Sequence, residues 1–279
     1  MPGPDSESHG MSAPPSAAIE THALRRVFGD LVAVEGLDLS VHHGQIFGLL
    51  GPNGAGKSTV IKMLTTLLPP TSGSASVAGF DLVRQPSEVR RRIGYVPQML
   101  SADGGLTGRE NLALSARLYR IPRGQRGPRI REALEFMDLA GFGDALVRTY
   151  SGGMIRRLEL AQAMLHEPEV LFLDEPTIGL DPVARHAVWQ RLRDLRQRRE
   201  MTILLTTHDM EEAEALCVRL AILHAGAVVR LGSPADLRAA IGPEATLDDV
   251  FIQAAGGAIG EGGTYHDVRQ LRRTVGRLG

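Results

Sequence analysis

The sequence predicts an α/β fold in which helices cover a mostly parallel sheet. Short apolar runs of strand length alternate with helical segments along the chain, which is typical of strand–helix–strand units. One such run, at residues 45–50, leads into the glycine-rich stretch GPNGAGKST at residues 51–59 and then into an apolar helical segment. A glycine-rich loop between a strand and a helix is typical of phosphate binding at the carboxyl edge of the sheet.

The N-terminal part is expected to consist of strands followed by a helix. Residues 19–49 alternate between apolar and polar positions, most clearly at residues 37–41, as half-buried strands do. Gly44 marks a turn before the buried strand at residues 45–50. The next helix, expected at residues 59–68, ends there because two prolines follow and a proline cannot continue a helix.

Strands and helices continue to alternate through the rest of the chain. Apolar residues spaced three and four apart predict helices, and short apolar runs bounded by turn residues predict strands. The expected helices cover residues 111–139 with a break at 122–124, then 151–165, 183–198 and 210–216, and the expected strands cover residues 74–77, 170–174 and 202–206.

Composition and charge narrow the classes of protein to consider. The 279 residues are 43% hydrophobic and 23% charged, so a sizeable core can form. The formal net charge of −1 lacks the basic excess of a dedicated nucleic-acid binder, and no nucleic-acid partner is expected. A single cysteine, Cys217, excludes an internal disulfide and fits a reducing cytoplasm. No apolar run approaches the roughly 18 residues of a membrane helix.

The stretch GPNGAGKST fits the pattern G-x-x-x-x-G-K-[ST], whose chemistry explains its residues. Glycines allow positive φ angles and lack Cβ atoms, so the backbone can curl around an anion in front of a helix N-terminus. Lys57 supplies a point charge for the β- and γ-phosphates, and the Ser58 hydroxyl can bind Mg²⁺. A chance glycine turn is the alternative, which the flanking strand and helix disfavour. The predicted ATP-binding residues here are Gly51, Pro52, Asn53, Gly54, Ala55, Gly56, Lys57, Ser58 and Thr59.

Acidic residues and a histidine follow two other predicted strands. Asp174 and Glu175 end the strand at residues 170–174, where buried carboxylates need a partner such as Mg²⁺. We assign Asp174 to the magnesium shell and Glu175 to orienting or deprotonating the attacking water. His208, which follows the strand at residues 202–206, is expected to contact the γ-phosphate. The alternatives are a surface turn with two exposed acids and a structural histidine.

Together these motifs resemble the nucleotide-binding domain of an ABC transporter, which is a P-loop NTPase. The chain resembles that family over residues 19–232. The loop GPNGAGKST resembles the Walker A motif and VLFLDEP the Walker B motif, with the remaining motifs in the family's order. The resemblance assigns Gln98 to a Q-loop that helps to hold Mg²⁺, His208 to the switch histidine, Asp181 to the D-loop, and Phe28 to stacking on adenine. It implies the cofactors ATP and Mg²⁺, with Glu175, His208 and Gln98 as catalytic residues.

A second anion site is predicted by the stretch YSGGM at residues 150–154, which resembles the ABC signature sequence. Ser151 and the N–H groups of Gly152 and Gly153 precede a helix, and the simplest alternative is an ordinary N-cap. In the family this second site, together with Asp181, serves the ATP of a partner subunit in a head-to-tail dimer. Met154 stands where the family often has Gln, and it cannot donate the same hydrogen bond.

The resemblance also implies a division into segments. Residues 1–18 are expected to be a disordered leader and residues 19–235 a nucleotide-binding domain with an antiparallel N-terminal β-subdomain and an inserted helical subdomain at about 99–165. Residues 236–279 form a C-terminal extension. Its last residues repeat apolar side chains every three or four positions between arginines, which predicts either a short basic amphipathic helix or a frayed terminus.

The branch of the family that the chain resembles is the drug exporters similar to daunorubicin/doxorubicin resistance ATPases, on the stretches at residues 148–161 and 247–252. The resemblance implies an ABC-2-type permease of about six spans as partner, a self-dimer or a dimer with a homologous ATPase, and a peripheral position on the cytoplasmic face of the membrane. Residues 99–106, after Gln98, either contact that permease or pack on the helical subdomain. The alternatives are a soluble ABC ATPase in DNA repair or translation, and an importer ATPase.

Overall fold

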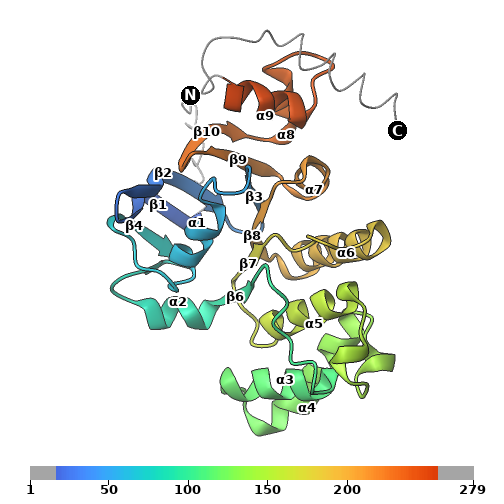
Figure 1. The fold of residues 1–279 in the computed structure, drawn as a ribbon. Helices are drawn as coiled ribbons and strands as arrows, with labels where there is room; N and C mark the ends of the chain where they lie inside the picture. Colours follow the sequence, from blue (N-terminus) through green and yellow to red (C-terminus); the bar gives the residue numbers. More distant parts are fainter. Residues whose placement is uncertain (1–16, 257–279) are drawn as a thin grey trace, which may run out of the picture.

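The structure, a computed structural model, describes residues 17–256, which form two sheets surrounded by helices (Figure 1). The larger sheet has the order β10-β9-β3-β8-β7-β6, in which only the β9–β10 pair is antiparallel. The smaller sheet is antiparallel, with the order β2-β1-β4-β5. The strands are β1 (Ala17–Phe28), β2 (Leu31–His42), β3 (Ile46–Leu50), β4 (Ser72–Val77), β5 (Phe80–Asp81), β6 (Ile93–Val96), β7 (Val170–Asp174), β8 (Thr202–Thr207), β9 (Arg219–His224) and β10 (Ala227–Gly232).

The helices follow the strands in an order that gives parallel connections. The α-helices are α1 (Lys57–Leu64), α2 (Pro86–Arg92), α3 (Gly108–Leu118), α4 (Arg123–Phe136), α5 (Gly152–Met164), α6 (Pro182–Arg199), α7 (Met210–Leu216), α8 (Pro234–Ala239) and α9 (Leu247–Gly256), with short 3₁₀ turns at Ala140–Phe142 and Val147–Thr149. None of the helices within residues 17–256 combines the length and the apolar character needed to cross a bilayer.

The larger sheet is buried on both faces, and its pleat divides the apolar side chains between two cores. In β3, Phe47 and Leu49 belong to the core shared with α1 and the smaller sheet, while Ile46 and Leu50 belong to the core on the other face. Successive side chains of a strand point to opposite faces, so an unbroken apolar run serves both cores. This explains why β3, β7 and β8 show no polar alternation.

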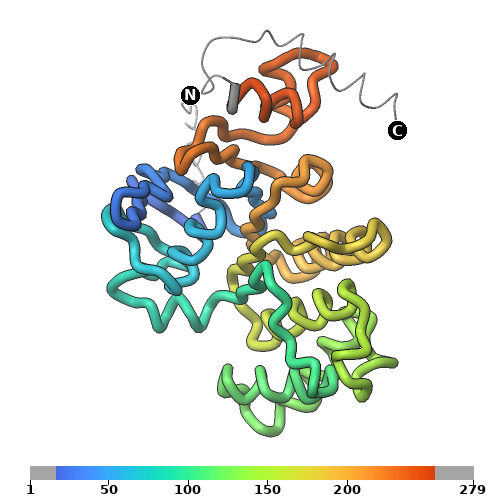
Figure 2. Tube along the Cα trace, viewed as in Figure 1, coloured from blue at the N-terminus to red at the C-terminus, as the bar shows by residue number. Residues whose placement is uncertain are grey.

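The helical subdomain is inserted between β6 and β7. Helices α3, α4 and α5 lie together at one end of the molecule, beyond the sheet edge formed by β6 (Figure 1). Figure 2 shows this green to yellow-green segment of the chain leaving the sheet and returning to it. The predicted α/β class, with its parallel core, antiparallel β-subdomain and inserted helices, is confirmed.

Some boundaries differ from those expected. Ala17 and Ala18, assigned to the leader, lie in β1, where Ala18 is buried. Helix α3 begins at Gly108, three residues early, because Thr107 and Glu110 form a reciprocal capping box. The basic tail expected after residue 256 and residues 1–16 of the leader lie outside the described residues.

Candidate active site

The loop between β3 and α1 brings backbone rather than side chains to the carboxyl edge of the larger sheet. Gly54 and Gly56 have φ angles of +83° and +101°, which residues with a Cβ rarely adopt. A Cβ at Gly56 would lie 2.4 Å from the carbonyl oxygen of Ala33, and one at Gly51 would lie 2.4 Å from that of Leu223. These glycines are therefore required for the loop to curl against the neighbouring strands.

Lys57 is the first residue of α1, and its charge is held inside the loop. Its side chain is only 5% exposed, and Nζ donates to the carbonyl oxygens of Gly51 (2.7 Å) and Pro52 (3.1 Å). The same ammonium lies 3.2 Å from Oε1 of Glu175. A buried cation at the N-terminus of a helix is a suitable partner for an anionic ligand.

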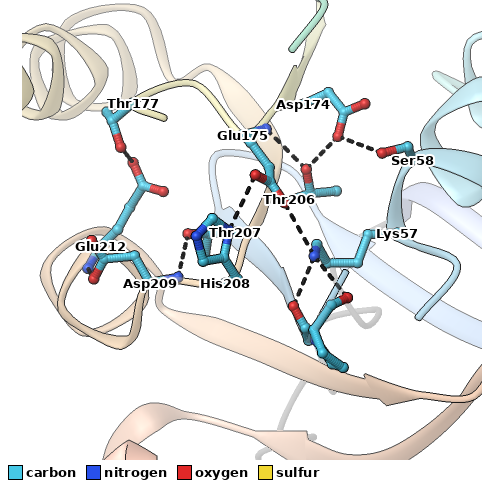
Figure 3. A network of polar contacts seen from close by, with 12 residues as sticks. Lys57, Ser58, Asp174, Glu175, Thr177, Thr206, Thr207, His208, Asp209 and Glu212 are labelled. Atoms are coloured by element: carbon cyan, nitrogen blue, oxygen red, sulfur yellow. Dashed lines mark hydrogen bonds and ion pairs between the residues drawn. The ribbon is translucent and has the colours of Figure 1, made fainter. Parts of the chain in front are cut away.

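Asp174 ends β7 and is held by hydroxyl groups from two neighbouring elements (Figure 3). Oδ1 accepts hydrogen bonds from Ser58 Oγ at 3.1 Å and from Thr206 Oγ1 at 2.6 Å. Burial, together with the negative charge of Asp174, raises the pKa of Tyr95 on β6 to about 12, so that phenol stays protonated. The two hydrogen bonds to Oδ1 hold the Asp174 carboxylate beside the Ser58 hydroxyl.

Glu175 is buried and held in an unusual backbone conformation. Its φ angle is +49°, and its N–H donates to Thr206 Oγ1 at 3.0 Å. Oε1 faces Lys57, whereas Oε2 lies 3.1 Å from Nδ1 of His208 (Figure 3). The left-handed backbone at Glu175 stores local strain where β7 ends.

A pocket of about 560 Å³ opens over these residues. Of the predicted ATP-binding and catalytic residues, those that line it are Phe28, Pro52, Asn53, Gly54, Gly56, Lys57, Ser58, Thr59, Gln98 and Glu175. Gly51 and Ala55 pack inward, and Asp174 and His208 reach the site through Ser58 and Glu175. Phe28 stands at the rim, 43% exposed, with the Arg26 guanidinium 4.5 Å from its ring centroid.

The residues present fit a nucleotide with Mg²⁺. The loop that lines the pocket contains Gly54 and Gly56, whose positive φ angles let the backbone curl in front of α1, and the buried ammonium of Lys57 supplies positive charge for a phosphate there. Ser58 and Asp174 offer adjacent oxygen atoms, the ligands that Mg²⁺ prefers. The exposed ring of Phe28 offers an aromatic face for a base.

The predicted residues for the ATP of a partner subunit form a separate group. Ser151 caps α5 by accepting from the N–H of Met154 at 3.3 Å, and Asp181 caps α6 by accepting from the N–H of Ala184 at 2.9 Å. The two helix starts are in contact, since a Cβ at Gly153 would lie 2.6 Å from that of Ala184. None of Ser151, Gly152, Gly153 and Asp181 lines the pocket around Lys57.

The loop that carries Gln98 is tied to α5 by a buried ion pair that the sequence analysis missed. Arg156 donates to the carbonyl oxygens of Pro97 (2.7 Å) and Gln98 (2.8 Å) and lies 3.0 Å from Glu159. Glu159 in turn accepts from the N–H and the hydroxyl of Ser101. Each side chain of the pair is 2% exposed. An arginine and a glutamate three residues apart, between apolar positions of the predicted helix, were the signal available in the sequence.

Another missed residue is Glu212 on α7, whose carboxylate joins three elements. Oε1 accepts from Thr177 Oγ1 at 2.6 Å and from Trp189 Nε1 at 3.0 Å, and Thr207 donates to the same carboxyl group. Burial raises the pKa of Glu212 above its usual value. Thr177 follows Glu175 by two residues, Thr207 directly precedes His208, and Trp189 lies on α6. The Glu212 side chain therefore connects the segment that carries Glu175 with the segment that carries His208.

Five pocket residues also escaped the sequence analysis. They come from the start of β2 and the turn between β9 and β10, and they are Leu31, Val32, Ala33, Ala225 and Gly226. All five are apolar or glycine, so their residue types carry no chemical signal.

The fold and the site define a class of protein, a P-loop nucleotide-binding ATPase. Residues 34–178 match the family model described as ABC transporter. The chain is 47% identical over 236 residues to the daunorubicin/doxorubicin resistance ATP-binding protein DrrA of Streptomyces peucetius, covering 83% of this chain and 70% of that protein. It is 44% identical over 222 residues to the Nod factor export ATP-binding protein I of Cupriavidus metallidurans, covering 80% and 73%.

Comparison with solved structures indicates the same family. The structure of an ATP-binding subunit of an ABC transporter superposes with a TM-score of 0.76 at 31% identity, covering 85% of this chain and 99% of that one. CbiO1 of Clostridium perfringens, part of the ABC transporter complex cbiONQ, gives a TM-score of 0.73 at 25% identity, covering 80% and 91%. This chain belongs to the ABC transporter family, as an ATP-binding subunit whose ATPase activity is coupled to transport.

Proposed function

We propose that this chain is the ATP-hydrolysing subunit of an exporter that moves a drug-like or hydrophobic compound through a separate ABC-2-type permease of about six spans. The similarity to drug-resistance and Nod factor export proteins supports the direction of transport. The main support for ATP hydrolysis is a cluster of contacting side chains at the carboxyl edge of the larger sheet, formed by Lys57, Ser58, Asp174, Glu175 and His208. The subunit then works peripherally, on the cytoplasmic face of the membrane.

Each site residue has a role that follows from its chemistry. The buried ammonium of Lys57 binds the β- and γ-phosphates, and Phe28 stacks on the base. Ser58 and Asp174, with Gln98, hold Mg²⁺, which when bound neutralises charge on the phosphate oxygens.

Glu175 acts as the general base. Its two oxygens face the buried cation and the histidine, so the side chain is held in one orientation beside the phosphate loop. His208, with about half of its side chain exposed, fixes the second oxygen and faces the site from β8. Accepting a proton from water at Glu175 is the step that these contacts prepare.

The second group of residues is proposed to serve a second ATPase subunit in a head-to-tail dimer, either another copy or a homologous chain. Ser151, Gly152 and Gly153 present a hydroxyl and backbone N–H groups at the N-terminus of α5, and Asp181 begins α6 beside them. Because this group lies outside the pocket around Lys57, it is suited to the triphosphate bound by the other subunit. Closing and opening of the dimer then drives the permease.

A substitution of the base tests the assignment. Glu175→Gln removes the proton acceptor while keeping the shape of the side chain, so turnover is expected to fall by at least about a hundredfold with ATP binding retained. The readouts are phosphate release, and ATP binding together with dimer formation by size-exclusion chromatography with Mg·ATP. Glu135→Gln, on the surface of α4, is a matched control and should leave turnover unchanged. Near-normal turnover of the Glu175 variant would reject its role as base.

The partner is tested by copurification from membranes under mild detergent. Copurification of a protein with about six apolar spans would support the transport assignment. That protein should also stimulate ATP turnover by the wild type but not by Glu175→Gln. Recovery of a functional soluble partner alone, with no membrane protein associated under any nucleotide condition, would contradict it.

A further inference from the structure

The corner between α3 and α4 carries a concentration of positive charge that the active site does not use. Residues 111–131 contain six arginines and no aspartate or glutamate, whereas the whole chain has a formal net charge of −1. Four of these arginines are exposed and have no ion pair among residues 17–256, and they are Arg117, Arg120, Arg123 and Arg131. We name the surface formed by residues 114–131 the arginine corner.

The arginine corner has a defined backbone. Arg117 lies in the last turn of α3, Arg120 has a φ angle of +56° in the connection, and Arg123 begins α4. The connection is fixed because Nε of Arg126 donates to the carbonyl oxygen of Ile121 at 2.7 Å. Three unpaired guanidinium groups are therefore presented within seven residues of ordered chain.

Exposed apolar side chains lie among the cations. Leu114, Leu118 and Tyr119 are 46%, 73% and 40% exposed. The ring of Tyr119 is held by stacking on His166, with 3.7 Å between centroids. Aromatic and aliphatic side chains interspersed with arginine are typical of surfaces that rest on a bilayer interface, where the cations meet lipid phosphates and the apolar groups enter the headgroup boundary.

The arginine corner adjoins the loop that carries Gln98. Leu118 and Tyr119 line one groove together with Pro97 and Ser101, which flank Gln98 on either side. The inference takes the first of the two alternatives for residues 99–106, contact with the permease of the proposed function, and a permease is embedded in the bilayer. The surface beside that contact would then face lipid headgroups, so the inference depends on the proposed function for its setting.

We propose that the arginine corner binds the anionic phospholipid headgroups that surround the permease. The partner is a membrane surface rather than a nucleic acid, because the chain lacks an overall basic excess and its exposed leucines have no apolar partner on a duplex. The attraction orients the subunit with its Gln98 loop toward the membrane before or during permease contact.

The experiment uses the full chain and sedimentation with vesicles of equal parts phosphatidylcholine and phosphatidylglycerol, beside vesicles of phosphatidylcholine alone. The test variant carries Arg117→Gln, Arg120→Gln and Arg123→Gln. The control variant carries Arg84→Gln, Arg198→Gln and Arg230→Gln, three exposed arginines outside residues 114–131, and has the same net charge as the test variant. Thermal unfolding confirms that both variants are folded.

The proposal expects the wild-type protein and the control variant to bind the anionic vesicles alike, and the test variant to bind at least about tenfold more weakly. Equal binding by both variants, or equal binding of the wild type to both kinds of vesicle, would overturn it. Loss of duplex-DNA binding in the test variant, without any vesicle binding by the wild type, would instead assign the surface to nucleic acid. ATP turnover of the same preparations is measured in parallel, so failed lipid binding with intact turnover rejects the lipid inference alone.

Discussion

At the scale of single residues, the carboxylate of Glu212 shows how the active site is supported from behind. Its three partners come from the segment after β7, the end of β8 and α6. All of these side chains are buried, so no water can replace a lost partner. The positions of Glu175 and His208 therefore depend on contacts that touch neither nucleotide nor metal.

Removing one partner of Glu212 is expected to slow catalysis more than it weakens ATP binding. Thr177→Val deletes a buried hydroxyl that donates at 2.6 Å, and we expect a fall in kcat of about tenfold with KM for ATP within about twofold. Thr65→Val is the matched control, because it deletes a buried hydroxyl that donates to Ile61 at the far end of α1. Equal kinetics of the two variants would show that Thr177 has no positioning role.

Glu212 also gives stability a dependence on pH. Burial raises its pKa from the usual 4.5, so the folded state favours the protonated carboxyl. The resulting stabilisation is fully present below pH 4.5 and is lost as the pH rises through the raised pKa of the folded protein. Glu212→Gln stays uncharged at every pH, so the wild type should lose stability relative to this variant as the pH rises through that window. Urea unfolding at a series of pH values measures this, and parallel curves for the two proteins would contradict it.

At the scale of elements, the sequence was most informative where one element supplies its own signal. The apolar runs of β3, β7 and β8 and the stretch GPNGAGKST predicted the sheet edge and the phosphate loop from local residues alone. The packing of Gly56 on the carbonyl group of Ala33 and of Gly51 on that of Leu223 could not be predicted, because it involves backbone atoms from strands distant in sequence. The start of α3 was predictable from Thr107 and Glu110, but the apolar spacing that we used begins only at Leu112.

The buried Arg156–Glu159 ion pair of α5, which holds the Gln98 loop through hydrogen bonds, is expected to be stabilising only while both charges are present. Arg156→Met leaves Glu159 buried without its cation and should lower the free energy of unfolding by about 3–5 kcal/mol. Arg25→Met, which breaks the exposed pair with Glu35, should cost about 1 kcal/mol or less. Urea unfolding measures both changes.

The double variant Arg156→Met/Glu159→Leu separates charge burial from packing. Because it removes both buried charges, it should recover much of the stability lost in Arg156→Met. A double variant as unstable as the single one would show that the hydrogen bonds to Pro97 and Gln98, rather than the unpaired carboxylate, account for the loss.

At the scale of the whole molecule, the separation of the two groups of site residues predicts complementation between inactive subunits. Lys57→Ala removes the phosphate-binding cation, and Ser151→Glu places a negative charge where the partner's triphosphate would bind. Each variant alone has no intact composite site. A mixed dimer has one, formed by Lys57 of one subunit and Ser151 of the other.

Mixing the two inactive proteins in equal amounts should therefore restore about a quarter of wild-type turnover, since half of the dimers are mixed and each has one of two sites intact. Phosphate release before and after mixing is the measurement. Mixing Lys57→Ala with Glu175→Gln is the control, because Lys57 and Glu175 belong to the same half of the composite site. In that mixed dimer one site lacks the lysine and the other lacks the base, so turnover should not recover. No recovery in the first mixture, with mixed dimers demonstrated, would contradict the composite site.

The anchoring of the Gln98 loop by Arg156 has a mechanical consequence. The guanidinium donates to two successive carbonyl groups of that loop, and Arg156 belongs to α5, the helix that Ser151 caps. A displacement of residues 97–98 is therefore expected to be transmitted through Arg156 to α5 and to Ser151 at its N-terminus. The loop after β6 and the N-terminus of α5 are thus coupled directly, through one side chain.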